Sequence, residues 1–181
     1  MMNSKSGFTL IEVIVVMVII AIMAAIAMPR FVDWLPNMRL KAAARDLYSN
    51  MQKARMLAVK SNKSTAIIFD DSNDRYDLCD QWSSTPTPGC TGNIQSISLD
   101  SYKSGIRFGH GQAAQSVTGG SFPASDISYS SPVKTAVFNP DGLSNSGYVY
   151  LENDSSDTAW AVGTLSSGVI KILKWQNGGW R

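Results

Sequence analysis

The chain has 181 residues and a formal net charge of +2, which suits one apolar anchor and one modest domain. Its single histidine and two cysteines are too few for a cysteine–histidine metal cluster, and it has no phosphate-binding glycine loop. We therefore expect no cofactor and no metal, and we interpret the protein as a non-enzyme.

Residues 8–28 form an apolar run of 21 residues whose only ionisable group is Glu12. At about 1.5 Å per residue, a helix of this length measures about 30 Å, which matches the hydrocarbon core of a bilayer. Lys5 is the one charge ahead of the run, and a positive charge there keeps that end in the cytoplasm. The pattern predicts a single-pass membrane helix with everything from Arg30 onward on the far side of the membrane.

Glu12 is unusual because a carboxylate inside an apolar span costs roughly 2.5 kcal/mol or more at mid-bilayer. One interpretation is that its side chain simply reaches the headgroups. Another follows from Gly7, because cutting the bond between Gly7 and Phe8 would create a cationic α-amine one turn from the carboxylate. A neighbouring chain would then present such an amine to Glu12.

An ordinary secretory signal is the rival interpretation of the same run. The residues Ala25-Ile26-Ala27 have the small-x-small pattern of a signal-peptidase site, which would make Met28 the first residue of the mature protein. The carboxylate of Glu12 and the length of the run argue against a signal peptide.

Past the run, Pro29 and Pro36 each remove a helix hydrogen bond and predict a helix kink. A helical pattern then continues to about residue 60, because apolar residues recur at spacings of three and four on one face: Leu40, Ala44, Leu47, Met51, Ala54 and Ala58. Residues 29–60 are therefore predicted as an amphipathic continuation of the helix that begins at residue 8.

Charge is distributed unevenly between this helix and the rest of the chain. Residues 30–63 contain eight basic and two acidic side chains, whereas seven basic and eleven acidic side chains follow from residue 64 onward. A basic stem and an acidic head would attract each other between neighbouring chains. Solvated faces of unrelated elements would give the same pattern, so both interpretations stay open.

From residue 61 the periodicity changes to that of short strands bounded by Gly, Pro, Asn or Ser. The predicted strands are 65–69, 94–99, 106–108, 135–138, 148–151, 159–164 and 169–175, and residues 109–132 are predicted to form a long loop. One helix followed by many strands predicts an α+β fold, in which the long N-terminal helix packs on an antiparallel β-sheet. Residues 61–181 would then be a β-rich globular domain.

Cys79 and Cys90 form the one cysteine pair, and an exported domain usually oxidises such a pair. Pro86, Pro88 and Gly89 lie between them and allow the loop to turn back. We expect a disulfide, which would stabilise the domain by about 2–3 kcal/mol.

Two further clusters invite a chemical interpretation. Five aspartates fall between residues 70 and 80, but a calcium loop needs glycine at its sixth and glutamate at its twelfth position, and neither is present. His110 lies between two glycines, with no orienting acid beside it in the sequence, although a distant partner stays open.

The N-terminal motif resembles that of type IV pilins and type II secretion pseudopilins. It consists of Gly7, Phe8, Thr9-Leu10, Glu12 and Pro29 at the family's spacing. In that family a prepilin peptidase cuts after the glycine and N-methylates the new phenylalanine, and the glutamate helps subunits dock into a filament. The resemblance thus implies a leader of residues 1–7, methylation at Phe8, an assembly contact at Glu12, and other pilins or pseudopilins as partners.

Later residues resemble a subgroup, the H-type minor pseudopilins and FimT-type minor pilins. The segments that carry this likeness are 46–55, 137–142 and the glycine-led strand after residue 167. The implied function is a structural subunit of a secretion pseudopilus or of a type IV pilus.

DNA uptake is the alternative function, because basic groups among aromatics can contact nucleic acid. Lys171, Lys174 and Arg181 lie near Trp175 and Trp180. DNA-binding FimT-type proteins carry an arginine directly after the glycine and another two residues later. Those positions hold Val169 and Lys171 here, which argues against DNA as a partner.

Overall fold

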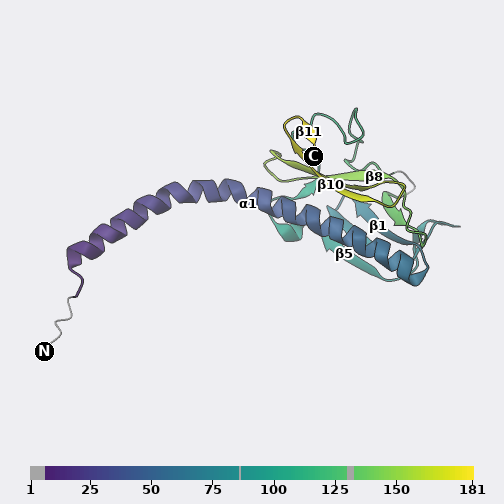
Figure 1. Ribbon diagram of the computed structural model, residues 1–181, viewed down its shortest axis with the longest axis horizontal. Helices are drawn as coiled ribbons and strands as arrows, with labels where there is room; N and C mark the ends of the chain where they lie inside the picture. The colour runs from purple at the N-terminus through teal and green to yellow at the C-terminus, as the bar shows by residue number, and fades with distance from the viewer. Residues whose placement is uncertain (1–6, 86, 130–132) are drawn as a thin grey trace. The chain divides into compact units, whose positions relative to one another are not determined.

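The computed structural model describes residues 7–85, 87–129 and 133–181, and it leaves the side chains of residues 27–33 undescribed. The chain divides into two compact units, Met1–Leu35 and Pro36–Arg181. One helix, α1 (Leu10–Ser61), contributes to both units (Figure 1). Each unit is described by itself.

In the first unit, α1 begins after Thr9, which caps it. The Thr9 hydroxyl accepts a hydrogen bond from the Glu12 amide at 3.3 Å, and the Thr9 carbonyl accepts one from the Val13 amide. The apolar side chains of residues 10–26 are exposed on every side of the helix. Over the residues described, no helix combines the length and the apolarity of a membrane span. The anchor expected over residues 8–28 includes undescribed side chains and stays a prediction.

The predicted bend also remains untested. The assigned helix continues through the positions of Pro29 and Pro36 without interruption. The side chain of Pro29 lies outside the described set, and Pro36 begins the second unit.

The second unit contains the β-structure. Over the described residues, a first antiparallel sheet has the order β5 (Ile94–Ser98), β2 (Arg75–Cys79), β1 (Thr65–Asp70), β7 (Thr135–Phe138). A second has the order β11 (Gly179–Trp180), β10 (Ile170–Gln176), β9 (Ala159–Thr164), β8 (Gly147–Glu152), β6 (Arg107–Phe108). A small ladder joins β3 (Trp82–Ser83) to β4 (Gly89–Cys90), and a short 3-10 helix, η1 (Leu99–Tyr102), follows β5.

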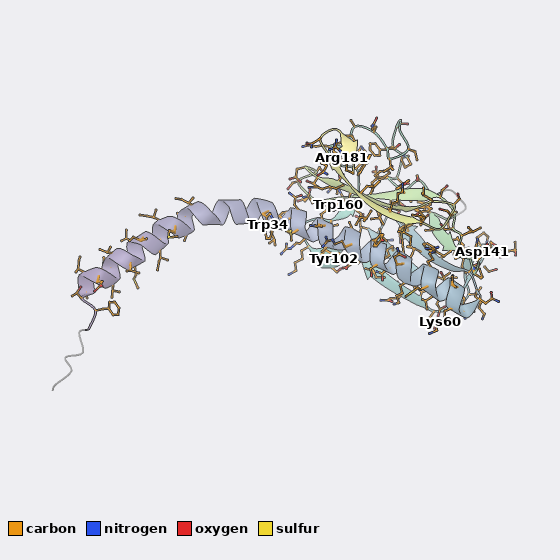
Figure 2. The ribbon with its side chains drawn as sticks, viewed as in Figure 1. Trp34, Lys60, Tyr102, Asp141, Trp160 and Arg181 are labelled. Carbon is orange, nitrogen blue, oxygen red and sulfur yellow. A yellow bond between two sulfur atoms is a disulfide. The ribbon has the colours of Figure 1, made fainter. Side chains whose placement is uncertain are left out.

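The predicted apolar stripe of α1 is the centre of the core. All six of its residues from Leu40 to Ala58 have no exposed surface. They pack in one cluster with side chains from both sheets, among them Ile67 and Tyr76 of the first and Val149 and Val162 of the second. Figure 2 shows side chains filling the space between this part of α1 and the strands. The α+β prediction is confirmed.

The strand predictions were largely right, with four omissions. The seven predicted strands match β1, β5, β6, β7, β8, β9 and β10 to within about one residue at most ends. The strands β2, β3, β4 and β11 were not predicted. The aspartates before and within β2 suggested a solvated turn, but Tyr76 and Leu78 flank Asp77 on this strand and are buried.

The five aspartates are distributed over different contacts. Asp70 pairs with Arg75 at 3.0 Å, and Asp71 pairs with Lys134 at 2.7 Å. Asp74 accepts a hydrogen bond from the Phe108 amide, Asp80 accepts one from the Asn93 amide, and Asp77 lies on β2. Hydrogen bonds from Asn73, with the Arg75 charge, hold the pKa of Asp70 below its ordinary value. Among the described residues these carboxylates form no metal-binding group.

Close packing within the second sheet gives a stability prediction. A Cβ on Gly163 would overlap the Gly147 carbonyl oxygen and the Tyr148 ring, whereas a Cβ on Gly179 would meet open space. Gly163→Ala should therefore lower the free energy of unfolding by about 1–3 kcal/mol. Gly179→Ala should change it by less than about 0.5 kcal/mol. Urea unfolding of the full chain in detergent, followed by tryptophan fluorescence, measures both, and equal effects of the two variants would contradict this packing.

The cysteine pair gives a second prediction. Cys79 ends β2 and Cys90 lies in β4, and the structure joins them with 5.8 Å between their Cα atoms. We expect non-reducing peptide mapping of the exported protein to recover the two cysteine peptides linked. The variant with both cysteines changed to serine should lose about 2–3 kcal/mol of stability. Two free thiols in the exported wild-type protein would reject the pairing.

Candidate functional site

The candidate processing site is the segment just ahead of α1. Gly7, Phe8 and Thr9 precede the first helical residue, so the Gly7–Phe8 peptide bond lies outside the helix. No heavy atom lies within 4 Å of a Cβ built on Gly7, and the Phe8 side chain is 84% exposed. Nothing in the described chain shields this bond from a peptidase.

Thr9, predicted only as part of the N-terminal motif, also caps α1 through the hydrogen bond that its hydroxyl accepts from the Glu12 amide. Thr9 and Glu12 have the spacing of a capping box, a local pattern that the sequence itself contains. The carboxylate also lies in the first turn, where the helix dipole favours a negative charge.

Glu12 lies on an apolar stripe of the first unit. A shallow groove there is lined by Phe8, Glu12, Val13, Val16, Met17 and Ile20. Phe8 and Glu12 are four residues apart, so they occupy neighbouring positions on one face. Removing residues 1–7 would place the new amine at the edge of this groove, one turn from the carboxylate.

The structure brings two of the three basic residues near the C-terminus together, Lys174 and Arg181, and places Lys171 on the opposite face of β10. Lys171 pairs with Gly163 and Lys174 with Trp160 across the β9–β10 ladder. Side chains three residues apart on a strand point to opposite faces. Arg181 exchanges backbone hydrogen bonds with Lys174. The three cations therefore do not form a continuous DNA-binding face.

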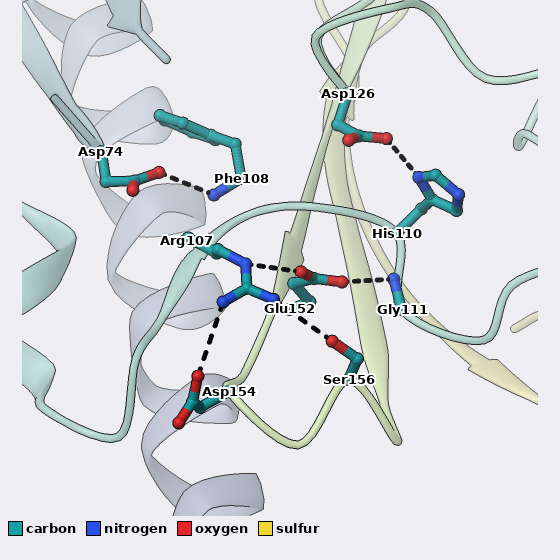
Figure 3. Close-up of polar contacts among 9 residues, drawn as sticks. All are labelled: Asp74, Arg107, Phe108, His110, Gly111, Asp126, Glu152, Asp154 and Ser156. Carbon is teal, nitrogen blue, oxygen red and sulfur yellow. Dashed lines mark hydrogen bonds and ion pairs between the residues drawn. The ribbon is translucent and has the colours of Figure 1, made fainter. Parts of the chain in front are cut away.

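His110 has a partner that the local sequence did not suggest. Its Nδ1 atom lies 2.5 Å from Asp126 Oδ1, sixteen residues later (Figure 3). Its ring stacks on Phe122 with the centroids 3.9 Å apart. Phe122 also meets Tyr150 edge-to-face. The pair closes the loop that follows β6 onto the outer face of the second sheet.

A carboxylate beside this pair fixes the start of the same loop. Glu152 accepts hydrogen bonds from Arg107 Nε at 2.7 Å and from the Gly111 amide at 2.8 Å (Figure 3). Arg107 also reaches Asp154 and Ser156. Each of these polar groups has its hydrogen-bond or ion-pair partner within the network. We therefore interpret the network as structural, with the role of fixing the loop that follows β6.

Polar contacts also tie the start of the second unit's helix to its loops. Asn37 donates a hydrogen bond to Asp157, Arg39 donates to Ser104, and Tyr102 donates to Asp46. Burial alone would raise the pKa of Asp157, but hydrogen bonds from Asn37 and Asn153 lower it overall. Burial, and then the Asp46 contact, raise the pKa of Tyr102.

Two family models match this chain, one over its N-terminal segment and one over most of the following domain. The family described as type II transport protein GspH matches residues 43–168, and the prokaryotic N-terminal methylation motif matches residues 2–28. The structure resembles that of the minor pseudopilin EpsH from the type 2 secretion system of Vibrio cholerae, with a TM-score of 0.50 and 14% identity. That match covers 75% of this chain and 96% of the other, and it supports the fold.

More distant sequence relatives are fimbrial proteins. One from Moraxella nonliquefaciens is 32% identical over 73 residues, which are 40% of this chain and 44% of that protein. One from Pseudomonas aeruginosa is 31% identical over 77 residues, which are 42% of this chain and 49% of that protein. The chain thus spans less than half the length of these curated relatives.

The predicted likeness to H-type minor pseudopilins is confirmed, because the family match covers well over half of the chain. The chain belongs to the GspH family of type II transport proteins.

Proposed function

We propose that the protein is made as a prepilin and becomes a minor pseudopilin of a type II secretion filament. The observation that carries this proposal is the methylation motif over residues 2–28, followed by the GspH match over residues 43–168. In this role the chain is the substrate of a prepilin peptidase and a structural partner of other pseudopilins.

The geometry of the first unit supports processing at Gly7. The Gly7–Phe8 bond is exposed and non-helical, and the helix begins two residues after Phe8. A small residue before the bond fits a narrow peptidase site, and cutting there leaves the apolar run attached. The proposed product starts at Phe8, is N-methylated there, and is held in the inner membrane by residues 8–28.

The position of Glu12 supports a role in assembly. In an apolar filament core its carboxylate would need a cationic partner, and the Phe8 amine of a neighbouring subunit supplies one. The second unit would lie in the periplasm before assembly and on the filament, or at its tip, afterwards.

Processing is tested by Gly7→Leu. A bulky side chain before the bond should block cleavage, so the full-length precursor should accumulate in the membrane, while Gly179→Ala serves as a control that is cleaved normally. Mass spectrometry of the wild-type protein should find Phe8 first, carrying one methyl group. A mature protein that begins at Met28 would instead establish an ordinary secretory signal.

Assembly is tested by comparing Glu12→Gln with Glu12→Val. Glutamine retains the capping pattern but not the charge, and valine retains neither. If Glu12 pairs with an amine in low dielectric, losing the charge costs several kcal/mol. Both variants should then be cleaved and membrane-held but nearly absent from isolated filaments. Normal incorporation of Glu12→Gln would reduce Glu12 to a capping residue.

A further inference from the structure

The face of α1 opposite the core carries a second regular pattern. Helical spacing places the following residues along one side of the helix in the second unit, where Lys41 and Gln52 are half-buried and the others are exposed: Met38, Lys41, Arg45, Gln52, Met56, Val59 and Lys60. We refer to them as the outer stripe. Lys60 is turned away from the sheets near the end of the helix (Figure 2).

The outer stripe exposes three large apolar side chains along one helix face, whereas the other exposed ones of the domain, Ile94, Leu143 and Val169, lie apart in its strands and loops. Met56 is 69% exposed, Val59 is 54% exposed and Met38 is 40% exposed. Met56 and Val59 line a shallow groove together with Gln52, Arg55 and Lys60. Methionine is flexible and polarisable, and surfaces that bind other proteins use it often.

The cations of the stripe are not paired with any side chain that the structure describes. The side chains of Lys41, Arg45 and Lys60 form no hydrogen bond or ion pair with another described residue. Lys41 and Arg45 are four residues apart, where two like charges weaken a helix. The helix dipole stabilises a cation only in the last turn of a helix. Of these three residues, only Lys60 lies in the last turn of α1.

The acidic groups near this face are already engaged. Asp46, on the same helix, accepts a hydrogen bond from Tyr102 at 2.6 Å. In the described part of the chain, every recorded ion pair joins residues outside α1. Within the described part of the subunit, Lys41 and Arg45 therefore carry positive charge that no recorded ion pair neutralises, whereas Lys60 also complements the helix dipole.

We propose that the outer stripe binds an acidic face on the globular domain of a neighbouring pseudopilin. This proposal rests on the proposed function, since it needs a filament. The partner would bring carboxylates to Arg45 and Lys60 and an apolar side chain to the groove at Met56. Single exposed ion pairs contribute little, so the charges chiefly select the partner and its orientation.

The pattern favours a protein partner over a lipid surface. A helix that lies on a membrane needs a broad continuous apolar face. The continuous apolar face of this part of α1 is buried against the sheets, and the outer stripe alternates apolar and cationic groups.

The experiment uses the full chain in its own cells, with a photo-crosslinking amino acid at position 56 and, as a control, at exposed position 177. We expect crosslinks from position 56 to another pseudopilin.

The double variant Arg45→Glu with Lys60→Glu should reduce these crosslinks about fivefold or more, since it turns attraction into repulsion. Arg45→Lys with Lys60→Arg should retain them, as should Lys103→Glu with Lys171→Glu, which makes the same charge change elsewhere. Reversing the crosslinked partner's carboxylate to lysine should restore the crosslinks.

Crosslinks only to phospholipid, only at position 177, or unaffected by charge reversal would overturn the proposal. The N-terminus and filament content of the wild-type chain are measured in the same cells. If the chain is processed and incorporated but position 56 finds no pseudopilin, the inference alone fails. If the chain is neither processed nor incorporated, the proposed function fails as well.

Discussion

The burial of one face of α1 against both sheets is the contact on which the rest of the second unit depends. Small residues, including Ala43, Ala44, Ala54 and Ala58, let strands approach the helix closely, while Leu47 and Met51 fill the remaining space. The Thr65 hydroxyl donates a hydrogen bond to the Ala54 carbonyl at 2.8 Å, so β1 begins directly on the helix. Over the described residues the two sheets share no strand; they meet directly at contacts such as Phe69 with Phe108, and both pack on this common helical face.

The same contact leaves other described side chains of α1 exposed. In the second unit the core uses the Ala/Leu face and leaves the outer stripe exposed. In the first unit the described side chains from Phe8 to Ile26 are all exposed, so their apolar surface requires a partner that the isolated chain does not supply. We propose that a membrane covers this apolar surface before assembly and that a filament core covers it afterwards. The same helix would thus serve first as an anchor and then as an assembly element.

The sequence predicted the parts of the structure that repeat along the chain. The period of the α1 stripe and the boundaries of most strands came from local pattern, as did the processing motif. Contacts between distant residues were not accessible in this way. Asp126 lies sixteen residues from His110, and the buried Tyr76 and Leu78 of β2 lie beside a run of aspartates. Two missed features were local: the capping pattern at Thr9, and β11, which pairs with β10 across the Asn177-Gly178 turn, where both residues have positive φ.

The methionines of α1 provide the most direct test of this account. Met51 is fully buried in the core, and Met56, five residues later, is exposed on the outer stripe. Oxidative footprinting of the membrane-held subunit and of isolated filaments, read by mass spectrometry, compares them within one helix. The account predicts that Met51 resists oxidation in both states and that Met56 reacts in the free subunit and becomes protected in the filament. Equal reactivity of the two in the free subunit would contradict the packing of α1, and unchanged reactivity of Met56 on assembly would contradict its role as a contact surface.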